Sequence, residues 1–313
     1  MSVRTALFAR NQVGGMTAIE DMALTTGDRY FVDSGKTSVG GDTTGHGGSP
    51  DIPFLTLDYA IGQCETSNGD IIFVMPGHAE TIATATALAL DVAGIKVMGL
   101  GWGNMIPTFT LSAEASIVTI SAANVWLENV KVISEFSTGV ASGISITADA
   151  DGCTLHKVQM RETTADKEFK TDWIAVATTV TDLTITNCNF HGLIAGTDVN
   201  CILFAGSTTN LYMENNRFFG DFSGNVVEHA AGVALNAQIL GNRIVNMDTG
   251  AASYSLNFKT ASTGYAFDNY GFSNKNDAPI FAGDAMYWDQ NSAGNTLASS
   301  GILPHPAAVA TVP

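Results

Sequence analysis

The feature that most constrains the fold is an eight-residue pattern that recurs every 26 to 30 residues along the chain. It is plainest in LTITNCNF (Leu183–Phe190), where apolar side chains stand at the first, third and eighth positions. A repeat of this length indicates stacked supersecondary units, each of which buries its apolar face against its neighbours. The other copies are VWLENVKV (Val125–Val132), CTLHKVQM (Cys153–Met160), LYMENNRF (Leu211–Phe218), AQILGNRI (Ala237–Ile244) and YAFDNYGF (Tyr265–Phe272).

The repeating unit is β rather than helical, because apolar residues alternate with period two and the copies are rich in β-branched and aromatic residues. In four coils a second apolar segment starts nine residues before the pattern. These segments are Ile144–Thr147, Ile174–Ala177, Ile202–Ala205 and Leu256–Lys259. Short strands repeated in this way predict an all-β fold, a single-stranded parallel β-helix of about seven coils, and parallel crossovers favour the right hand.

The fifth position of the pattern is a turn residue in most copies. It is Asn in four copies, Gly in one and Lys157 in one, and the four asparagines are Asn129, Asn187, Asn215 and Asn269. The chain must bend sharply between two strands of a coil, and Asn tolerates the left-handed backbone that such a bend requires. We therefore interpret this column as structural, and we expect its side chains to hydrogen-bond to the neighbouring coils.

Composition excludes several classes of function. The chain has a formal net charge of −16, from 14 Lys and Arg against 30 Asp and Glu, which disfavours nucleic-acid binding. The most hydrophobic region, Ala85–Leu100, is interrupted by Asp91 and Lys96, so no membrane span is expected. The N-terminus lacks the apolar segment of a signal peptide. Cys153 and Cys188 fall at apolar positions of the repeat and are expected to be free core thiols.

Four segments follow from the limits of the repeat. They are an N-terminal arm (1–28), a strand with a glycine-rich loop and a capping helix (29–70), the parallel β-helix (71–272), and a C-terminal cap or tail (273–313). The last segment has no repeat but contains adjacent aromatic residues, and Tyr287 and Trp288 are its candidate docking residues.

The segment before the first coil contains a loop and a short amphipathic stretch. The loop, Asp33–Asp51, is rich in glycine and holds Asp42, His46 and Asp51, whose spacing matches no known metal motif and favours a solvated loop. The stretch Thr56–Cys64 has apolar residues at helical spacing, with Thr56 as the N-cap. We expect this helix to close the end of the β-helix and shield its edge.

Two segments resemble a known superfamily. SPDIPFLTLDYAI (Ser49–Ile61) followed by GDIIFVMPGHAET (Gly69–Thr81) looks like the opening of many pectate-lyase-like right-handed β-helix proteins. That superfamily includes polysaccharide lyases and hydrolases, phage tailspikes and virion proteins. The whole chain most resembles the β-helix proteins of tailed phages. The resemblance implies a virion structural protein, either head-decorating or tail-associated, with capsid or tail proteins as partners and a homotrimeric assembly.

The outward positions of aligned coils are the places where a catalytic site of this fold would lie. Lyases of this fold gather several carboxylates on one outward face, bind Ca²⁺ there and use a nearby Arg or Lys as base. The outward fourth position holds Glu128, His156, Thr186, Glu214, Leu240 and Asp268. Glu128 and Glu214 are three coils apart, about 14 Å at the usual strand spacing, which is too far for a glycosidase pair. The sequence therefore predicts no catalytic residue, no metal ligand and no cofactor.

Two other functions stay open at this point. One is a tailspike-like polysaccharide lyase or hydrolase, with a site assembled by loops or at a subunit boundary. The other is a non-catalytic module that binds host surface glycan through exposed aromatic residues, for which Trp126, Tyr212 and Trp173 are the candidate surface contacts. Arg217 and Arg243 occupy one column in adjacent coils and form a modest cationic spot.

Overall fold

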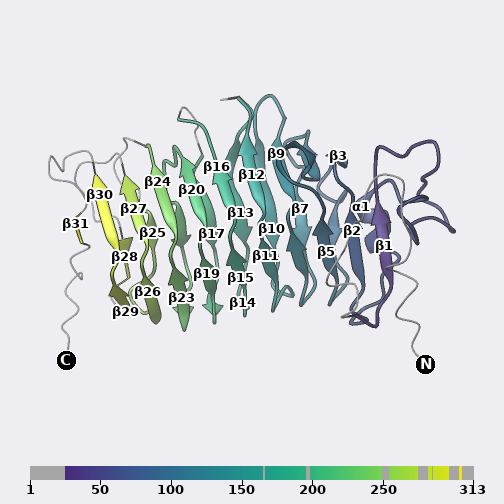
Figure 1. Cartoon of the computed structure of the whole chain (residues 1–313). Helices are drawn as coiled ribbons and strands as arrows, with labels where there is room; N and C mark the ends of the chain where they lie inside the picture. Colours follow the sequence, from purple (N-terminus) through teal and green to yellow (C-terminus); the bar gives the residue numbers. More distant parts are fainter. Residues whose placement is uncertain are drawn as a thin grey trace.

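The chain forms an elongated stack of parallel strands, with β1 at one end and β30 at the other (Figure 1). The computed structural model describes residues 25–164, 166–194, 198–248, 254–273, 281–283, 285–295 and 303–304. Each coil passes in turn through three sheets, here called A, B and C, and successive coils pair in parallel. The predicted right-handed parallel β-helix is confirmed. Among the described residues no helix is long and apolar enough to cross a membrane.

Sheet A contains the first half of the repeated pattern. Its strands are β1 (Arg29–Val32), β2 (Ile71–Val74), β5 (Lys96–Gly99), β8 (Trp126–Glu128), β11 (Thr154–His156), β15 (Thr184–Thr186), β19 (Tyr212–Glu214), β23 (Ala237–Leu240), β26 (Gly264–Phe267) and β29 (Met286–Asp289).

Sheet B contains the second half of the pattern. Its strands are β3 (Ala79–Ile82), β6 (Thr108–Leu111), β9 (Lys131–Ser134), β12 (Gln159–Glu162), β16 (Asn189–His191), β20 (Arg217–Gly220), β24 (Arg243–Asn246), β27 (Tyr270–Ser273), β30 (Ser292–Asn295) and the antiparallel β31 (Leu303–Pro304).

Sheet C contains the predicted second apolar segment of each coil. Its strands are β4 (Ala89–Leu90), β7 (Val118–Ile120), β10 (Val140–Ile146), β13 (Phe169–Val176), β17 (Asn200–Phe204), β21 (Val227–His229), β25 (Leu256–Asn257) and β28 (Phe281–Ala282). A small fourth sheet joins β14 (Val180–Thr181), β18 (Thr208–Thr209) and β22 (Ala234–Leu235) between sheets C and A.

The core fills the inside of the coils. Alternate side chains of each strand point inward and are buried, as period two requires. The inward positions of sheets A and B stack as two apolar columns, Leu127, Leu155, Ile185, Met213 and Ile239 in one and Val132, Met160, Phe190, Phe218 and Ile244 in the other. Cys153 and Cys188 are buried free thiols within this core, as predicted.

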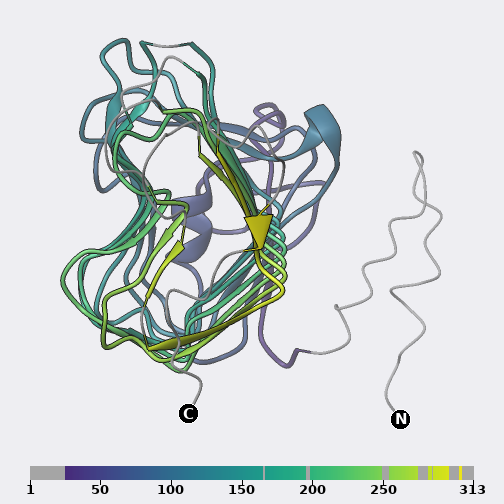
Figure 2. The ribbon, with the colours of Figure 1, turned by 90° about the vertical axis from the view of Figure 1, so that its left-hand side faces the viewer.

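A short helix closes the N-terminal end. The helix α1 (Leu57–Ile61) buries Leu57, Ala60 and Ile61 and lies at the centre of the coil cross-section when the rod is viewed along its axis (Figure 2). Thr56 stands at its N-cap with extended backbone, as predicted. Its hydroxyl does not cap the helix, because the Leu57 N–H donates instead to Glu80 Oε2 at 2.9 Å.

The stack continues past Phe272, where the sequence analysis ends the coils. Strands β28, β29 and β30 extend the three sheets by a further coil, so the parallel strands run to Asn295. Trp288 stacks on Phe281 with ring centroids 5.5 Å apart and donates from Nε1 to the Gly283 carbonyl. Tyr287 is 65% exposed. Most of the predicted N-terminal arm, 1–28, lies outside the described residues.

The turn between sheets A and B has one left-handed residue per coil. From β8 onward the residues are Asn129, Lys157, Asn187, Asn215, Gly241, Asp268 and Gln290, with φ between 51° and 61°. Asn269 was assigned to this column, which is wrong by one position, because Gly241 aligns with Asp268 and Asn242 with Asn269. The error arose from Tyr265 and Phe267, which mimic core positions but point outward, whereas Ala266 points inward and is fully buried.

A second, buried asparagine column lies one residue further on. Asn216, Asn242, Asn269 and Asn291 stack in four consecutive coils, and each amide Nδ2 donates to Oδ1 of the next at 2.8 to 2.9 Å. The same Nδ2 atoms also reach main-chain carbonyls of the preceding coil. The predicted hydrogen bonding between stacked asparagines therefore occurs mainly in this column, which we call the asparagine ladder.

Candidate functional site

The outward face of sheet A presents two aligned columns of side chains. The strand register stacks Lys96, Trp126, Thr154, Thr184, Tyr212, Gln238, Tyr265 and Tyr287 in one column. It stacks Met98, Glu128, His156, Thr186, Glu214, Leu240, Phe267 and Asp289 in the other. These positions face outward because the residues between them fill the core. The face is thus a continuous strip of aromatic and polar side chains along the rod.

The N-terminal part of this face is a cluster around Trp126, which is 38% exposed. Its Nε1 donates to Glu128 Oε2 at 3.0 Å, and the Lys96 ammonium lies 4.8 Å above its ring and 3.3 Å from the same carboxylate oxygen. The His156 ring lies 6.1 Å from Trp126 and its Nδ1 is 2.8 Å from Thr186 Oγ1. Partial burial lowers the pKa of His156 against the raising effect of Glu128, so its imidazole is mainly neutral at pH 7 and available as a hydrogen-bonding group.

The C-terminal part of the face carries tyrosines, of which Tyr212 is half-buried and Tyr265 and Tyr287 are exposed. The Tyr212 hydroxyl donates to Glu214 Oε2 at 2.9 Å, and partial burial together with this carboxylate raises the pKa of Tyr212. The Tyr265 hydroxyl lies 3.4 Å from Gln238 Oε1. Tyr265 and Phe267 were missed by the sequence analysis because of the register error described above. The signal that finds them is the 27-residue spacing between Asn242 and Asn269 rather than the apolar pattern.

Trp173 does not belong to this face. It was predicted to be a surface contact, which is wrong, because its side chain is fully buried among aromatic rings in sheet C. Phe169, Phe190 and Phe222 surround it, with ring centroids 4.9 to 6.4 Å away. The register of β13 with β10 shifts between Val140 and Ser142, where β13 contains one residue more, and this bulge breaks the alternation of buried and exposed positions before Trp173.

The carboxylates of sheet A are held apart by the register. Glu128 and Glu214 are separated by His156 and Thr186 in the intervening coils, so they cannot act on one glycosidic bond. Glu128 is already engaged by Trp126 and Lys96. This arrangement is suited to binding an extended ligand through rings and hydrogen bonds along several coils.

Comparison with known proteins identifies the fold. No protein-family model and no curated protein matches the sequence. Among solved structures, the pectin methylesterase from Aspergillus niger matches with a TM-score of 0.53 and 14% identity, over 89% of this chain and 87% of that one. The chain therefore shares the parallel β-helix fold of that enzyme. A rhamnogalacturonan lyase (TM-score 0.46, 17% identity, 89% of this chain and 64% of that one) and a pectin methylesterase in complex with hexasaccharide VII (0.43, 11%, 81% and 80%) are also similar.

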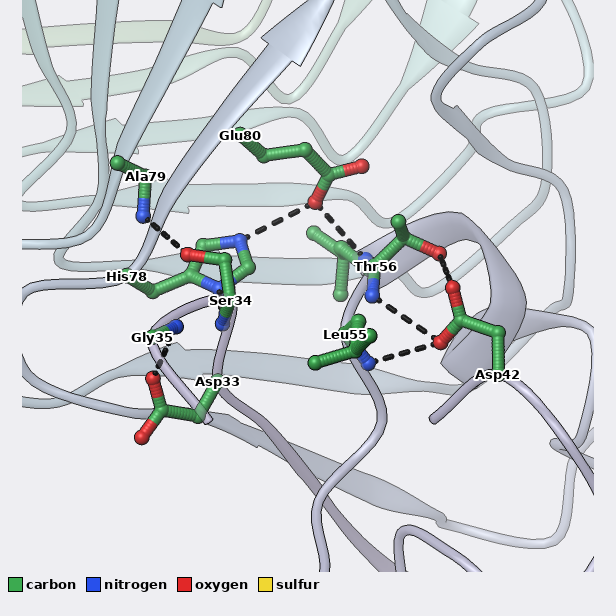
Figure 3. A network of polar contacts seen from close by, with 10 residues as sticks. Asp33, Ser34, Gly35, Asp42, Leu55, Thr56, His78, Ala79 and Glu80 are labelled. Atoms are coloured by element: carbon green, nitrogen blue, oxygen red, sulfur yellow. Dashed lines mark hydrogen bonds and ion pairs between the residues drawn. The ribbon is translucent and has the colours of Figure 1, made fainter. Parts of the chain in front are cut away.

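The glycine-rich loop before the first coil is fixed by a polar network (Figure 3). Asp42 accepts hydrogen bonds from the main-chain N–H groups of Leu55 and Thr56 and from the Thr56 hydroxyl, so its carboxylate holds the start of α1. His46 contacts only Thr43 within this loop through its ring nitrogen. Within the described residues, no three His, Cys, Asp or Glu side chains gather in a way that could hold a metal ion.

The first coil is tied to the same network through His78 and Glu80. The Ser34 N–H donates to His78 Nδ1 at 3.0 Å, which places the ring proton on Nε2, 3.1 Å from Glu80 Oε2. The same Glu80 oxygen accepts the Leu57 N–H (Figure 3). The segment GDIIFVMPGHAET is one of the two on which the superfamily resemblance depends. Through His78 and Glu80 it connects the capping helix and the preceding loop to the first coil by hydrogen bonds. Its polar residues have a structural role.

A buried group of carboxyls lies beneath the loops between sheets B and C. Glu162, Glu168 and Asp198 are each less than 10% exposed. Glu162 accepts the main-chain N–H groups of Phe169 and Leu193, whereas neither Asp198 carboxyl oxygen has a hydrogen-bond donor among the described residues. Burial, followed by the charges of Glu162 and Glu168, raises the pKa of Asp198 to about 10. Nothing local in the sequence marks these three acids as buried.

Proposed function

We propose that this protein is a structural component of a phage particle that displays its β-helical rod and binds a polysaccharide along the outward face of sheet A. The observation that carries the binding role is the register that aligns exposed Trp126, Tyr265 and Tyr287 with half-buried Tyr212 in one outward column. The resemblance of the whole chain to the β-helix proteins of tailed phages supports the particle assignment.

The chemistry of the column fits sugar rings. Tryptophan and tyrosine offer rigid, amphipathic contact area at low entropic cost, so they bind well on an open surface. Threonine, glutamine and carboxylate side chains between the rings provide donors and acceptors for hydroxyl groups. Trp126 and Tyr212 are three coils apart, about 14 Å at the strand spacing, so a ligand that contacts both must be an extended oligomer.

The binding role is tested by retention of purified surface polysaccharide from the bacterial host on immobilised protein. The double variant Trp126→Ala/Tyr265→Ala should weaken retention about tenfold or more, as the loss of aromatic anchors usually does. Trp102→Ala is the matched control, since Trp102 is 86% exposed but lies outside sheet A. Equal retention by the wild type and the double variant would contradict the proposal. New reducing ends or ultraviolet-absorbing unsaturated products would instead favour a tailspike-like hydrolase or lyase.

The particle assignment is tested separately by mass spectrometry of purified phage particles. Abundant copies are expected, and their release with heads or with tails distinguishes a decoration protein from a tail-associated one. Deleting residues 1–24 and, in another variant, residues 296–313 tests attachment by the terminal segments. Particle binding by both truncated proteins would place the attachment on the rod instead.

We also propose a homotrimer of parallel rods, as the resemblance to phage β-helices implies. A net charge of −16 per chain opposes the packing of acidic faces, so the interface should use an apolar face rich in Thr and Ser. Three copies would strengthen weak contacts to a particle through effective concentration. Light scattering at micromolar concentration should give three times the chain mass of 32.7 kDa, and a monomer would count against the trimer.

A further inference from the structure

The outward face of sheet B gathers basic side chains from five consecutive coils. One column of the register runs through Lys131, Gln159, Asn189, Arg217 and Arg243, and the other through Ile133, Arg161, His191, Phe219 and Val245. We call the five basic members, Lys131, Arg161, His191, Arg217 and Arg243, the cationic strip. Sequence spacing alone aligned only the two arginines at 217 and 243, because Arg161 and His191 stand two positions further along their strands.

The cationic strip contrasts with the charge of the whole chain. Acidic residues outnumber Lys and Arg by 30 to 14, yet the outward neighbours of the strip on its own sheet are neutral or apolar. No ion pair joins Lys131, Arg161 or Arg217 to a carboxylate within the part of the chain that the structure describes. Arg243 lies 3.7 Å from Asp268, and both side chains are about half exposed. Such exposed pairs contribute little and exchange readily for another anion.

The centre of the strip is a stacked pair flanked by two arginines. The His191 ring stacks on Phe219 with centroids 5.0 Å apart and planes 17° apart. Partial burial, and then the charges of Arg161 and Arg217, lower the pKa of His191. Arg161 and Arg217 therefore place their positive charges near His191, one from the preceding coil and the other from the following coil. Phe219 supplies an apolar surface there, and Tyr270 and Phe272 continue the outward face beyond Arg243.

We propose that the cationic strip is a second binding surface, separate from sheet A, that takes an acidic polysaccharide laid along the rod. Lys131, Arg161, Arg217 and Arg243 are spread over five coils that lie about 4.8 Å apart, and only Arg217 and Arg243 are neighbours in one column, so the charges are distributed along the rod rather than concentrated. A polymer with about one acidic group per sugar suits this spacing, and its ring faces can pack on Phe219 and its neighbours. The net charge of −16 opposes any polyanion, but it repels duplex DNA, which carries one charge per about 1.7 Å, more strongly than a polymer with one charge per sugar.

The test uses full-length protein and three probes of defined chemistry: alginate, which carries one carboxylate per sugar, neutral dextran, and double-stranded DNA. The wild type should bind alginate in low salt and lose that binding as salt rises, because the contacts are ionic. It should bind dextran and DNA at least about tenfold more weakly than alginate. DNA bound as tightly as alginate would overturn the choice of polymer.

The location is tested by the double variant Arg161→Gln/Arg217→Gln, which should weaken alginate binding about tenfold or more and flatten its salt dependence. Both arginines are exposed, so the unfolding midpoint should not move. The matched control is Lys36→Gln/Lys259→Gln, which removes two exposed cations outside the strip and should keep wild-type binding. Equal weakening in both double variants would show that only net charge matters and would overturn the site. Trp126→Ala should leave alginate binding unchanged, and a loss there would assign the ligand to sheet A instead.

Discussion

The asparagine ladder and the buried carboxyl group show two ways in which this β-helix buries polar side chains. In the ladder, Asn216, Asn242, Asn269 and Asn291 occupy the same position in successive coils, and every amide finds its partner one coil away. In the carboxyl group, Glu162 and Asp198 lie beneath loops of different length, and the Asp198 oxygens have no donor among the described residues.

The difference shows what strict stacking contributes. An amide side chain has both a donor and an acceptor. In a column of amides at strand spacing, each side chain can therefore donate a hydrogen bond to one neighbour and accept one from the other. A carboxylate only accepts, so two of them in a buried place repel each other unless one takes up a proton. Regular coils therefore provide hydrogen-bond partners for buried polar groups. Beneath the irregular loops, the stability of the buried carboxyl group instead depends on pH.

The largest effect is expected from breaking the ladder. Asn242→Leu removes the acceptor of both the main-chain N–H and the side-chain amide of Asn216. Two buried donors without partners should lower the free energy of unfolding by about 3 kcal/mol. The measurement is chemical denaturation of the variant and the wild type. The matched control is Asn189→Leu, the same change at an outward position of sheet B, which should stay within about 0.5 kcal/mol.

The next effect concerns the carboxyl group and its pH dependence. The pKa of Asp198 is raised in the folded protein to about 10, so between about pH 4 and pH 10 the unfolded chain releases a proton that the folded one keeps. The free energy of unfolding therefore falls as the pH rises through that window. Asp198→Asn replaces the carboxyl with an amide that does not ionise. The free energy of unfolding of this variant, relative to that of the wild type, should therefore increase from pH 5 to pH 9. A difference that does not change with pH would contradict the assignment.

A smaller effect is expected at the exposed turn. Asn187 has a left-handed backbone (φ 55°), but its side chain is exposed, so the ladder does not depend on it. Asn187→Leu should cost about 1 kcal/mol, the penalty of a bulkier side chain in this conformation, and Asn187→Gly should cost less. Thermal unfolding of the two variants measures this. If Asn187→Leu were as harmful as Asn242→Leu, the turn would be part of the buried network.

The smallest effect is expected from lengthening the ladder. Cys188 precedes Asn216 in the same column, and its main-chain N–H already donates to Asn216 Oδ1. Cys188→Asn would place an amide beside that acceptor and beside the Leu155 carbonyl, which the thiol now approaches at 3.6 Å. We expect a change within about 1 kcal/mol, although an amide is buried. Ile185→Asn, at a core position with no such partners, should be strongly destabilising, and similar losses for both variants would refute this interpretation.

The sequence alone was sufficient to identify the fold, the capping helix and most of the strand pattern. It does so because each coil must bury the same inward positions, so apolar period two and turn residues recur at a nearly fixed interval. The turn residues Asn129, Asn187 and Asn215 could be assigned from this recurrence, and the structure places all three in the left-handed region. Trp126 could be assigned to the outward face of sheet A for the same reason.

Only the tertiary structure decided features that depend on alignment across irregular coils. A shift of one residue turns a strand's side chains to the opposite face, which is why Asn269 joins the ladder and Tyr265 faces outward. Loops that vary in length bury Trp173 and Asp198 without any local mark. The cationic strip also depends on the strand register. Arg161 and Arg217 are 56 residues apart in sequence, and the stacking of coils brings both close to His191.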